Sequence, residues 1–436
     1  MLLGVAPAAA EFMTGADISA LPVLESRGAV YRDAGRPGDL VPMFREHGVN
    51  WFRLRLFVNP NGQGVVTNDL AYTINLAQRV KASGAKLLLD FHYSDTWADP
   101  GRQTKPAAWT NLTGAALEQQ VHDYTRDSMA AFVAAGAAPE MVQIGNEISN
   151  GLLWNDGYPW SGGSHNAGFD RLADLLKAGI AGAKAGAGPE QEPLIMLHHD
   201  RGDAWGTTSS YFNRLVARNV DFDMIGYSYY PRWHGTIAQV EQNVNNTAAT
   251  YGKPVVIVEA GFPSRGAQFE PQEYEFPVTP AGQQAYLQSL VDLMQNVPGD
   301  LGRGVFWWYP EAVPVSGLSV YEGGRYGLFD AGGNLLPAID VFRAVNPPLP
   351  GDFTFNGVVD GDDLAIWSSM YGLAGQGLDA DADGNGRVDG ADLLVWQRAL
   401  TEFFQAPATT IPEPSALAVA ASLALIAWRW RRSPSR

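Results

Sequence analysis

The sequence predicts a (β/α)8 barrel that is followed by a small α-helical module. In residues 12–345, short apolar runs rich in β-formers alternate with longer helix-like stretches, as in a parallel sheet built from βα units. Eight such runs occur, and eight parallel strands in roughly 330 residues favour a closed barrel over an open doubly wound sheet. Beyond a Pro-rich break at 346–350, a duplicated acidic segment predicts the separate module.

The predicted strands are short apolar runs, most of them followed by polar or turn-forming residues. They span residues 12–18, 49–57, 86–92, 141–147, 194–199, 224–229, 254–260 and 304–309. No GxGxxG motif follows any of them, so dinucleotide binding has little support. The Gly- and Ala-rich stretch 178–188 instead predicts a small-residue helix that runs into a turn.

The acidic, cysteine-free composition limits the chemistry available to the chain. A net charge of −16 over 436 residues argues against nucleic acid as a partner, because phosphate binding needs a basic surface. The absence of cysteine excludes disulfides, thiolate metal sites and a cysteine nucleophile. Aromatic rings pack in ordinary hydrophobic cores as well as against the faces of sugars. Core packing is the commoner role, so a high aromatic content alone does not indicate a sugar-binding site. Five Trp residues fall in loops or at strand ends, where either role is open: Trp97, Trp109, Trp233, Trp307 and Trp308.

Polar residues at the C-terminal ends of the predicted strands would line the mouth of the barrel, where active sites of this fold lie. These residues are Asp17, Ser19, Arg53, Arg55, Asp90, His92, Asn146, Glu147, His198, His199, Tyr227, Tyr229, Glu259, Trp307 and Trp308. Because side chains alternate along a strand, a register error of one residue would turn any of them away from the mouth. For the same reason at most one of His198 and His199 faces it, as a substrate contact or wall residue rather than a metal ligand.

Two acidic residues, Glu147 and Glu259, end the fourth and seventh predicted strands and would face one another across the mouth. Hydrolysis of a glycosidic bond by two carboxyl groups needs one protonated and one ionised group. Glu147 follows an apolar run that would raise its pKa, so it is the predicted acid/base. Glu259 can be kept ionised by Arg53, Arg55 or Tyr229, so it is the predicted nucleophile. A single strand-end Glu is more often solvated or ion-paired, but the matched pair favours catalysis.

A set of longer motifs carries a family resemblance. The strings GADISALPVLESRG, WFRLRLFVNP, DFHYSDTWADPGRQTKPAAW, VQIGNEISNGLLW, DMIGYSYYPRWHG and FPVTPAGQ resemble, in order, those of family 53 glycoside hydrolases, the arabinogalactan endo-β-1,4-galactanases. The resemblance covers about residues 12–345 and implies a barrel with the acid/base on strand four and the nucleophile on strand seven. It implies no cofactor for catalysis, and it implies that Asn146 binds the sugar 2-hydroxyl. The sugar contacts it implies are Asp17, Arg55, His92, Asn146, Tyr229 and Trp308.

The resemblance implies endo-acting, retaining hydrolysis of β-1,4-D-galactosidic bonds in type I arabinogalactan, the galactan of pectin. Two alternatives stay open: a β-1,4-mannanase or glucanase that uses the same two Glu residues, and a non-catalytic carbohydrate-binding protein of the cell surface. The sequence departs from the family after the last strand, where a Trp-Glu-Pro-Ala-Trp pattern is replaced by WYPEA at 308–312. We therefore expect the outer subsites to differ. Calcium ligands that some members carry in barrel loops cannot be placed on this sequence.

The small module contains a duplicated loop. Residues 352–363 read DFTFNGVVDGDD and residues 381–392 read DADGNGRVDGAD, 29 positions later. Both offer oxygen ligands at loop positions 1, 3, 5, 9 and 12 and Gly at position 6, the pattern of a calcium loop. The pair resembles a dockerin-type module (352–402), which implies structural Ca²⁺ and a cohesin-like protein partner; two acidic turns without metal are the alternative. The expected ligands of the first loop are Asp352, Thr354, Asn356, Asp360 and Asp363, and those of the second loop are Asp381, Asp383, Asn385, Asp389 and Asp392. The first site is expected to bind calcium more weakly, because Thr354 is a poorer ligand than Asp or Asn.

Both ends of the chain have the composition of targeting segments. Residues 1–11 are expected to be the remnant of a signal peptide, with a frayed apolar N-terminus as the alternative. Linkers are expected at 346–351 and 403–414. The segment 415–436 follows a Pro-Glu-Pro element and ends in a group of arginines. Its apolar run is shorter than the roughly 20 residues that a membrane span needs. It resembles a PEP-CTERM sorting signal, which implies a secreted or cell-surface protein with transient contact to membrane and sorting machinery.

Overall fold

The chain forms two compact units. The computed structural model describes residues 11–160, 163–266, 274–375 and 377–405. The first unit comprises Met1–Leu349 with Thr354–Val358, and the second comprises Pro350–Phe353 with Val359–Arg436. Most of the expected signal-peptide remnant, the second linker from residue 406 and the sorting segment lie outside the described residues.

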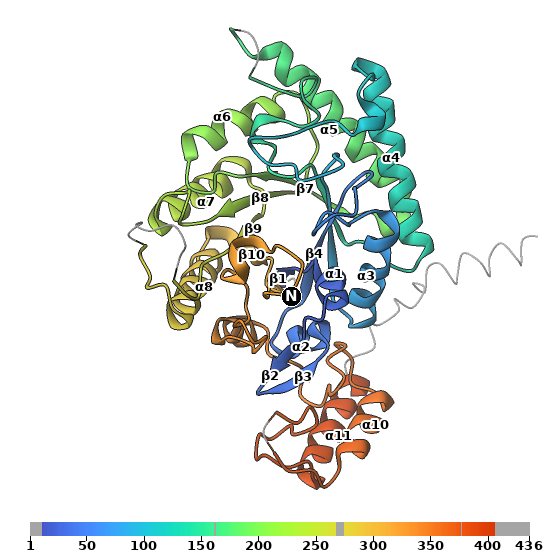
Figure 1. Cartoon of the computed structure of the whole chain (residues 1–436), viewed down its shortest axis with the longest axis vertical. Coiled ribbons are helices and arrows are strands. Elements are labelled where there is room, and N and C mark those ends of the chain that lie inside the picture. Colours follow the sequence, from blue (N-terminus) through green and yellow to red (C-terminus); the bar gives the residue numbers. More distant parts are fainter. Residues whose placement is uncertain (1–10, 161–162, 267–273, 376, 406–436) are drawn as a thin grey trace, which may run out of the picture. The chain divides into compact units, whose positions relative to one another are not determined.

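Eight parallel strands of the first unit close into a barrel (Figure 1). Around the barrel they follow the order β1-β10-β9-β8-β7-β6-β5-β4. The strands are β1 (Met13–Asp17), β4 (Trp51–Leu56), β5 (Lys86–Phe91), β6 (Met141–Ile144), β7 (Leu194–His199), β8 (Met224–Tyr229), β9 (Val255–Ala260) and β10 (Gly302–Trp308). Each predicted run overlaps one of these strands, the last of which begins two residues before its run, so the predicted barrel fold is confirmed. A short hairpin of β2 (Tyr31–Asp33) and β3 (Arg36–Gly38) is an addition that the alternating pattern did not predict.

Helices follow the strands and surround the barrel (Figure 1). In this unit they are α1 (Leu21–Ser26), α2 (Leu40–Glu46), α3 (Leu70–Ala82), α4 (Gly114–Ala134), α5 (Asn166–Ala187), α6 (Trp205–Val216), α7 (Ile237–Tyr251), α8 (Pro280–Gln295) and α9 (Asp340–Val345). The predicted small-residue helix is the C-terminal half of α5, which ends at Gly188 with a positive φ of 75°. Its glycines allow a close approach to α4: a Cβ on Gly186 would lie 2.2 Å from the Arg126 carbonyl oxygen.

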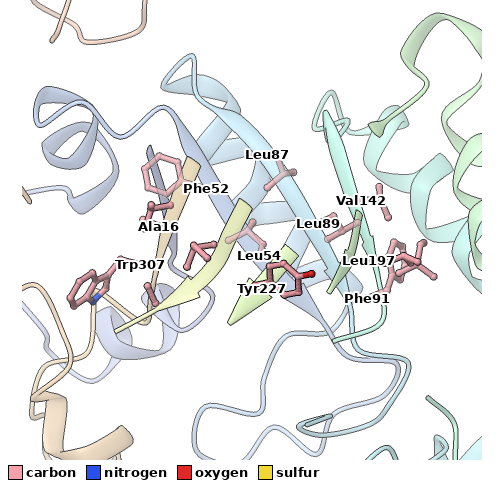
Figure 2. Close-up of a cluster of buried hydrophobic side chains, with 14 of the residues drawn as sticks. Ala16, Phe52, Leu54, Leu87, Leu89, Phe91, Val142, Leu197, Tyr227 and Trp307 are labelled. Carbon is pink, nitrogen blue, oxygen red and sulfur yellow. The ribbon is translucent and has the colours of Figure 1, made fainter. Parts of the chain in front are cut away.

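Alternation along the strands separates two buried layers. Outward-facing apolar side chains such as Phe52, Leu54, Leu89 and Val142 form the large core between barrel and helices (Figure 2). Inward-facing side chains fill the interior: Met13, Trp51, Leu88, Met141, Met196, Met224, Val256, Val258 and Phe306. Two residues further along four of the strands the same inward face becomes polar, at Arg53, Asp90, Gln143 and His198, and this brings functional groups toward the C-terminal mouth of the barrel.

A register shift in β9 decides where Glu259 points. Val256 and Val258 both belong to the interior cluster, so strict alternation would direct Glu259 outward. Tyr227 of β8 pairs with Ile257, but the next residue, Ser228, pairs with Glu259, so Val258 is skipped. Such a bulge re-aims the side chain that follows it. The bulge therefore returns Glu259 to the mouth.

The second unit contains two helices, α10 (Gly361–Met370) and α11 (Gly390–Gln405), the second of which includes the first three residues of the expected linker. Asp360 and Asp363 form a capping box at the start of α10. A small core holds the unit together, formed by Phe353, Val359, Ala380, Val388 and Trp396. Within the residues described, no helix combines the length and apolarity that crossing a membrane requires.

Candidate active site

A cavity of about 620 Å³ opens at the C-terminal ends of the barrel strands. Both predicted catalytic residues line it, together with five of the six predicted sugar contacts. These lining residues are Asp17, Arg55, His92, Asn146, Glu147, Glu259 and Trp308. The barrel therefore brings together residues that lie up to about 290 positions apart in the sequence.

Glu259 is held between a cation and a hydroxyl. Its Oε1 lies 2.7 Å from Nη1 of Arg53, and its Oε2 accepts a hydrogen bond of 3.0 Å from the Tyr230 hydroxyl. Burial, together with the charges of Asp17 and Asp90, raises the pKa of Glu259 above its ordinary value, while the charge of Arg53 and the hydrogen bond from Tyr230 act in the opposite direction. These two contacts stabilise the ionised carboxylate that a nucleophile requires.

Arg53 is itself fixed by acids and amides of three strands, β1, β5 and β6. Its guanidinium donates to Asp17 Oδ2 and Asp90 Oδ2, both at 2.8 Å, and to Asn146 Oδ1 at 2.8 Å. Gln143 Oε1 accepts from Nε at 3.2 Å. Although burial opposes ionisation, Arg53 and His92 lower the pKa of Asp90. A buried charge with all its donors satisfied keeps a fixed geometry, so Arg53 presents its charge to Glu259 without rearrangement.

Glu147 occupies a different environment. It lies in the left-handed region with φ of 46°, after Gly145 with φ of 85°, and this tight turn points its half-buried side chain into the cavity. Its Oε1 accepts a hydrogen bond of 2.6 Å from Ser228. Burial, followed by the charges of Glu259 and Asp200, raises the pKa of Glu147 well above its ordinary value. These surroundings favour the protonated form of Glu147.

His198 supports Glu147 from behind. Its Nδ1 lies 3.4 Å from the backbone nitrogen of Glu147. A backbone N–H can only donate, so Nδ1 must accept this hydrogen bond. Its Nε2 lies 2.8 Å from the Ser228 hydroxyl oxygen. Burial and the charge of Arg53 lower the pKa of His198 well below its ordinary value, so the ring is neutral. A neutral ring with its proton on Nε2 donates to Ser228, which in turn donates to Glu147. His199 points the other way, against Tyr211 and Phe212.

The remaining predicted sugar contacts are fixed by their neighbours. His92 Nε2 lies 3.0 Å from Asp90 Oδ2, and its Nδ1 accepts from the backbone of Ala98. Asn146 donates to the Ala98 carbonyl at 2.8 Å. The Arg55 guanidinium lies 4.2 Å from the centroid of the Trp97 ring. Each of these side chains thus reaches the cavity from a position with little rotational freedom.

Tyr229 is placed differently from the expectation. Its side chain is buried away from the cavity, donates a 2.9 Å hydrogen bond to the Gly235 carbonyl and stacks on Tyr286. The tyrosine in the cavity is the next residue, Tyr230. Ser228 of β8 points inward, so both Tyr227 and Tyr229 point outward by alternation, and Tyr230 lies just beyond the strand.

Three of the five candidate Trp residues form an aromatic wall. Trp97, Trp233 and Trp308 line the cavity, and Trp233 is 54% exposed. Trp97 and Trp308 meet edge to face with centroids 6.3 Å apart. Trp109 and Trp307 are buried elsewhere, with Trp307 donating to the Tyr326 carbonyl. Flat rings at the rim of a polar cavity are suited to the apolar faces of sugars.

The segment that departs from the family pattern contains a fully buried acid. Glu311 accepts a 2.9 Å hydrogen bond from the backbone of Ala20 and does not line the cavity. Burial and the charge of Asp17 raise the pKa of Glu311 well above its ordinary value, so its carboxyl group is neutral. This acid fixes the loop after β1 rather than forming a subsite wall.

Several residues that line the cavity, or that bond its lining side chains, were not predicted from the sequence. Gln143 and Ser228 lie inside their strands, at the inward positions that strict alternation from Met141 and Met224 would have identified. Tyr230, Asp200 and His234 lie in the segments just after their strands, where local pattern gives no direction for a side chain.

In the second unit, the second duplicated loop gathers three carboxylates. Oxygens of Asp381, Asp383 and Asp392 lie within 4.8 Å of one another. The backbone folds around them: Gly386 donates to Asp381 at 2.8 Å, and Ala382 donates to Asp392 at 2.8 Å. Hard oxygen donors of this kind fit calcium. Asn385 donates to Asp383, and Asp389 accepts from Ala391 at the start of α11.

The first duplicated loop is divided between the two units. Asp360 and Asp363 belong to the second unit, where they cap α10, and Asp352 is buried in it. Thr354 and Asn356 belong to the first unit. The ligand set predicted for this loop is therefore not described as one site.

Comparison with known proteins identifies relatives of the barrel. The description Glycosyl hydrolase family 53 matches residues 13–342. A probable arabinogalactan endo-β-1,4-galactanase A of Aspergillus terreus is 37% identical over 333 residues, which cover 73% of this chain and 90% of that protein. The solved GH53 catalytic domain of Ignisphaera aggregans is 31% identical with a TM-score of 0.70, covering 77% of this chain and 96% of the other. A structure from a study of two fungal β-1,4-galactanases is 32% identical with a TM-score of 0.68, covering 76% and 99%.

Proposed function

Because this chain belongs to glycosyl hydrolase family 53, we propose that it hydrolyses internal β-1,4-D-galactosidic bonds of type I arabinogalactan with retention of configuration. The observation that carries the proposal is the asymmetry of the two cavity carboxyls. Glu259 lies against Arg53 at 2.7 Å, whereas Glu147 accepts from the neutral Ser228 and has a strongly raised pKa. One ionised and one protonated carboxyl group are what a two-step glycosidase requires.

In the first step, Glu259 attacks the anomeric carbon while Glu147 protonates the departing glycosidic oxygen. Arg53 and Tyr230 keep Glu259 ionised and aimed until the glycosyl-enzyme bond forms. When this bond forms, Glu259 becomes a neutral ester and no longer repels an ionised Glu147. The pKa of Glu147 therefore falls. Glu147 then serves as the base that activates water in the second step, which regenerates Glu259.

The sugar next to Glu259 would be held by the fixed polar side chains around it. We assign this role to Asp17, Arg55, His92 and Asn146, with Trp308 as the stacking surface; all five line the cavity. Tyr230 takes the place that the sequence had suggested for Tyr229, because its hydroxyl reaches Glu259. Hydrogen bonds to the sugar 2-hydroxyl from such residues strengthen in the transition state.

Substrate assays test the proposal directly. Purified protein should release galactooligosaccharides from pectic galactan, and neither mannan nor cellulose should be cut at a comparable rate. Proton NMR of the first products should show the β-anomer. Preferential cleavage of mannan or glucan would support the alternative within the same chemistry, and first release of the α-anomer would overturn retention.

For the second unit we propose structural calcium at the loop that contains Asp381, Asp383, Asn385, Asp389 and Asp392. Clustered carboxylates repel one another without a cation, so metal binding would stabilise the fold of this unit. The proposal includes a dockerin-type role with a cohesin-like partner and export to the cell surface. The duplicated pattern and the gathered carboxylates support the calcium proposal.

Calorimetric titration of the whole protein with Ca²⁺ tests the metal proposal. We expect binding that is weakened by Asp381→Asn and is unchanged by Asp221→Asn, a substitution at an acid whose side chain is 79% exposed in the barrel unit. A titration without any heat of binding, in protein first stripped by a chelator, would refute it.

A further inference from the structure

Asp200 is a buried acid in the cavity that the two-carboxylate chemistry does not use. It follows the last residue of β7, lines the cavity and has a side chain only 14% exposed. Its Oδ1 has no hydrogen-bond partner among the residues that the structure describes. A buried carboxylate oxygen without a donor costs free energy, so this group is suited to receive a donor from a bound molecule.

The side chain lies on the Glu147 side of the cavity. Asp17 and Asp90 are the acids whose charges act on Glu259, and both are bonded to Arg53. The charge of Asp200 acts instead on Glu147, which follows the neighbouring strand β6. Because Glu259 must contact the anomeric carbon and Glu147 the departing oxygen, Asp200 lies where the leaving sugar would be bound.

The chemistry of the leaving sugar fits such a group. In a β-1,4-linked chain the departing oxygen is O4 of the next sugar, and hydroxyl groups at C3 and C6 lie beside it. A hydroxyl can donate to a carboxylate, and the two-fold rotation of an Asp side chain lets either oxygen receive it. The groups that face Asp200 are His199 at 3.5 Å, Arg201, His234 and Glu147. Burial raises the pKa of Asp200 above its ordinary value, while the Ser149 hydroxyl, His234 and Arg201 favour its ionised form.

We propose that Asp200 binds a hydroxyl group of the leaving sugar and thereby positions the departing oxygen against Glu147. The proposal rests on the function proposed above and extends it to a specificity residue for the sugar beyond the scissile bond. Substrates without a sugar at that position should not sense Asp200. This difference separates a binding role from a general contribution to folding.

The test compares Asp200→Asn and Asp200→Ala with the parent protein on two substrates. One is pectic galactan; the other is 2,4-dinitrophenyl β-galactobioside, whose leaving group is not a sugar and needs little protonation. On galactan, kcat/KM should fall about tenfold or more, the size of a lost hydrogen bond to a charged group. On the aryl glycoside, kcat/KM should stay close to the parent value. Asp221→Asn removes a charge at the surface and should leave both values unchanged.

The pH profile supplies a second readout. The negative charge of Asp200 raises the pKa of Glu147, so its removal should move the high-pH limb of kcat/KM on galactan to lower pH. Equal losses on both substrates without this shift, or no loss on galactan, would overturn the role of Asp200. Failure of the parent protein to cut galactan while it cleaves another β-1,4-glycan would refute the proposed substrate instead, and the comparison would then be repeated on that glycan.

Discussion

Two carboxyl groups of the same residue type differ in this cavity because of single neighbours. Arg53 and Tyr230 bond Glu259, whereas Glu147 is bonded by Ser228 and repelled by Asp200. A cation at contact distance stabilises the charged form of a carboxyl group, and burial with nearby negative charge stabilises the neutral form. Roles can therefore be tested one residue at a time.

Replacing each carboxyl should give opposite stereochemical outcomes. Glu259→Ala should abolish turnover of galactan, and azide should restore cleavage of an activated substrate with a glycosyl azide of inverted configuration. Glu147→Ala should lower galactan turnover by about 10²–10⁴, the range of general acid–base catalysis. An aryl substrate should still form the glycosyl-enzyme, and azide should give a product of retained configuration. NMR of the azide products checks the assignment; exchanged outcomes would reverse the two roles.

The two adjacent tyrosines at the end of β8 form a matched pair for the nucleophile. Tyr230→Phe removes the hydrogen bond that favours ionised Glu259, so the low-pH limb of kcat/KM should move to higher pH, with a loss of roughly tenfold. Tyr229→Phe removes a bond to Gly235 outside the cavity and should leave that limb in place. The measurement is the pH dependence of kcat/KM; a shift in Tyr229→Phe alone would contradict the geometry.

At the scale of elements, the contact between α4 and α5 depends on residues without side chains. Backbone atoms of α4 approach Gly182 and Gly186 so closely that a Cβ would meet a carbonyl oxygen at 2.4 and 2.2 Å. Alanine is the better helix former, but a clash with backbone cannot be relieved by rotating a side chain. Packing therefore outweighs propensity at these positions.

Gly186→Ala should destabilise the barrel by about 1–3 kcal/mol through overpacking. Gly206→Ala in α6 is the control, since nothing lies within 4 Å of its would-be Cβ. It should leave stability unchanged or raise it by up to about 1 kcal/mol through helix propensity. Urea unfolding monitored by circular dichroism measures both. Equal effects of the two substitutions would show that the α4–α5 contact tolerates a side chain.

At the scale of the whole molecule, the groups proposed for catalysis all belong to the first unit. The barrel holds them at the ends of all eight strands or just beyond, so their geometry depends on the closed sheet. The family description ends at residue 342, before the second unit begins. Segments beyond the barrel are thus expected to serve other purposes than bond cleavage.

Deletion of residues 412–436 should leave galactan turnover unchanged, because the catalytic and sugar-binding groups proposed above all lie in the barrel, between Asp17 and Trp308. The same deletion should release the protein from the cell envelope if the proposed sorting role holds. Turnover by the purified variant and its distribution between cells and medium are the measurements. Lost turnover in a folded variant would contradict the expectation that the segment is dispensable for catalysis. Unchanged retention by cells would contradict the sorting role.

The sequence by itself determined the barrel and the candidate carboxyls. Alternating apolar runs specify strands wherever both faces are buried, and polar residues that follow such a run are brought to one end of a parallel barrel. Glu147, Glu259, Asp17, Arg55, His92, Asn146 and Trp308 could all be named in this way, and all line the cavity.

Tertiary structure alone decided the direction of side chains near strand ends. The bulge at Val258 depends on how β8 and β9 pair, so the residue pattern of β9 does not reveal that Glu259 turns inward. One residue of register separates Tyr230 in the cavity from Tyr229 outside it. Asp200 and His234 lie beyond the strands, where only the closed barrel brings them into the same cavity as Glu147. Pairing between strands and loop geometry are non-local, and for this reason the sequence could indicate the carboxyls but not their partners.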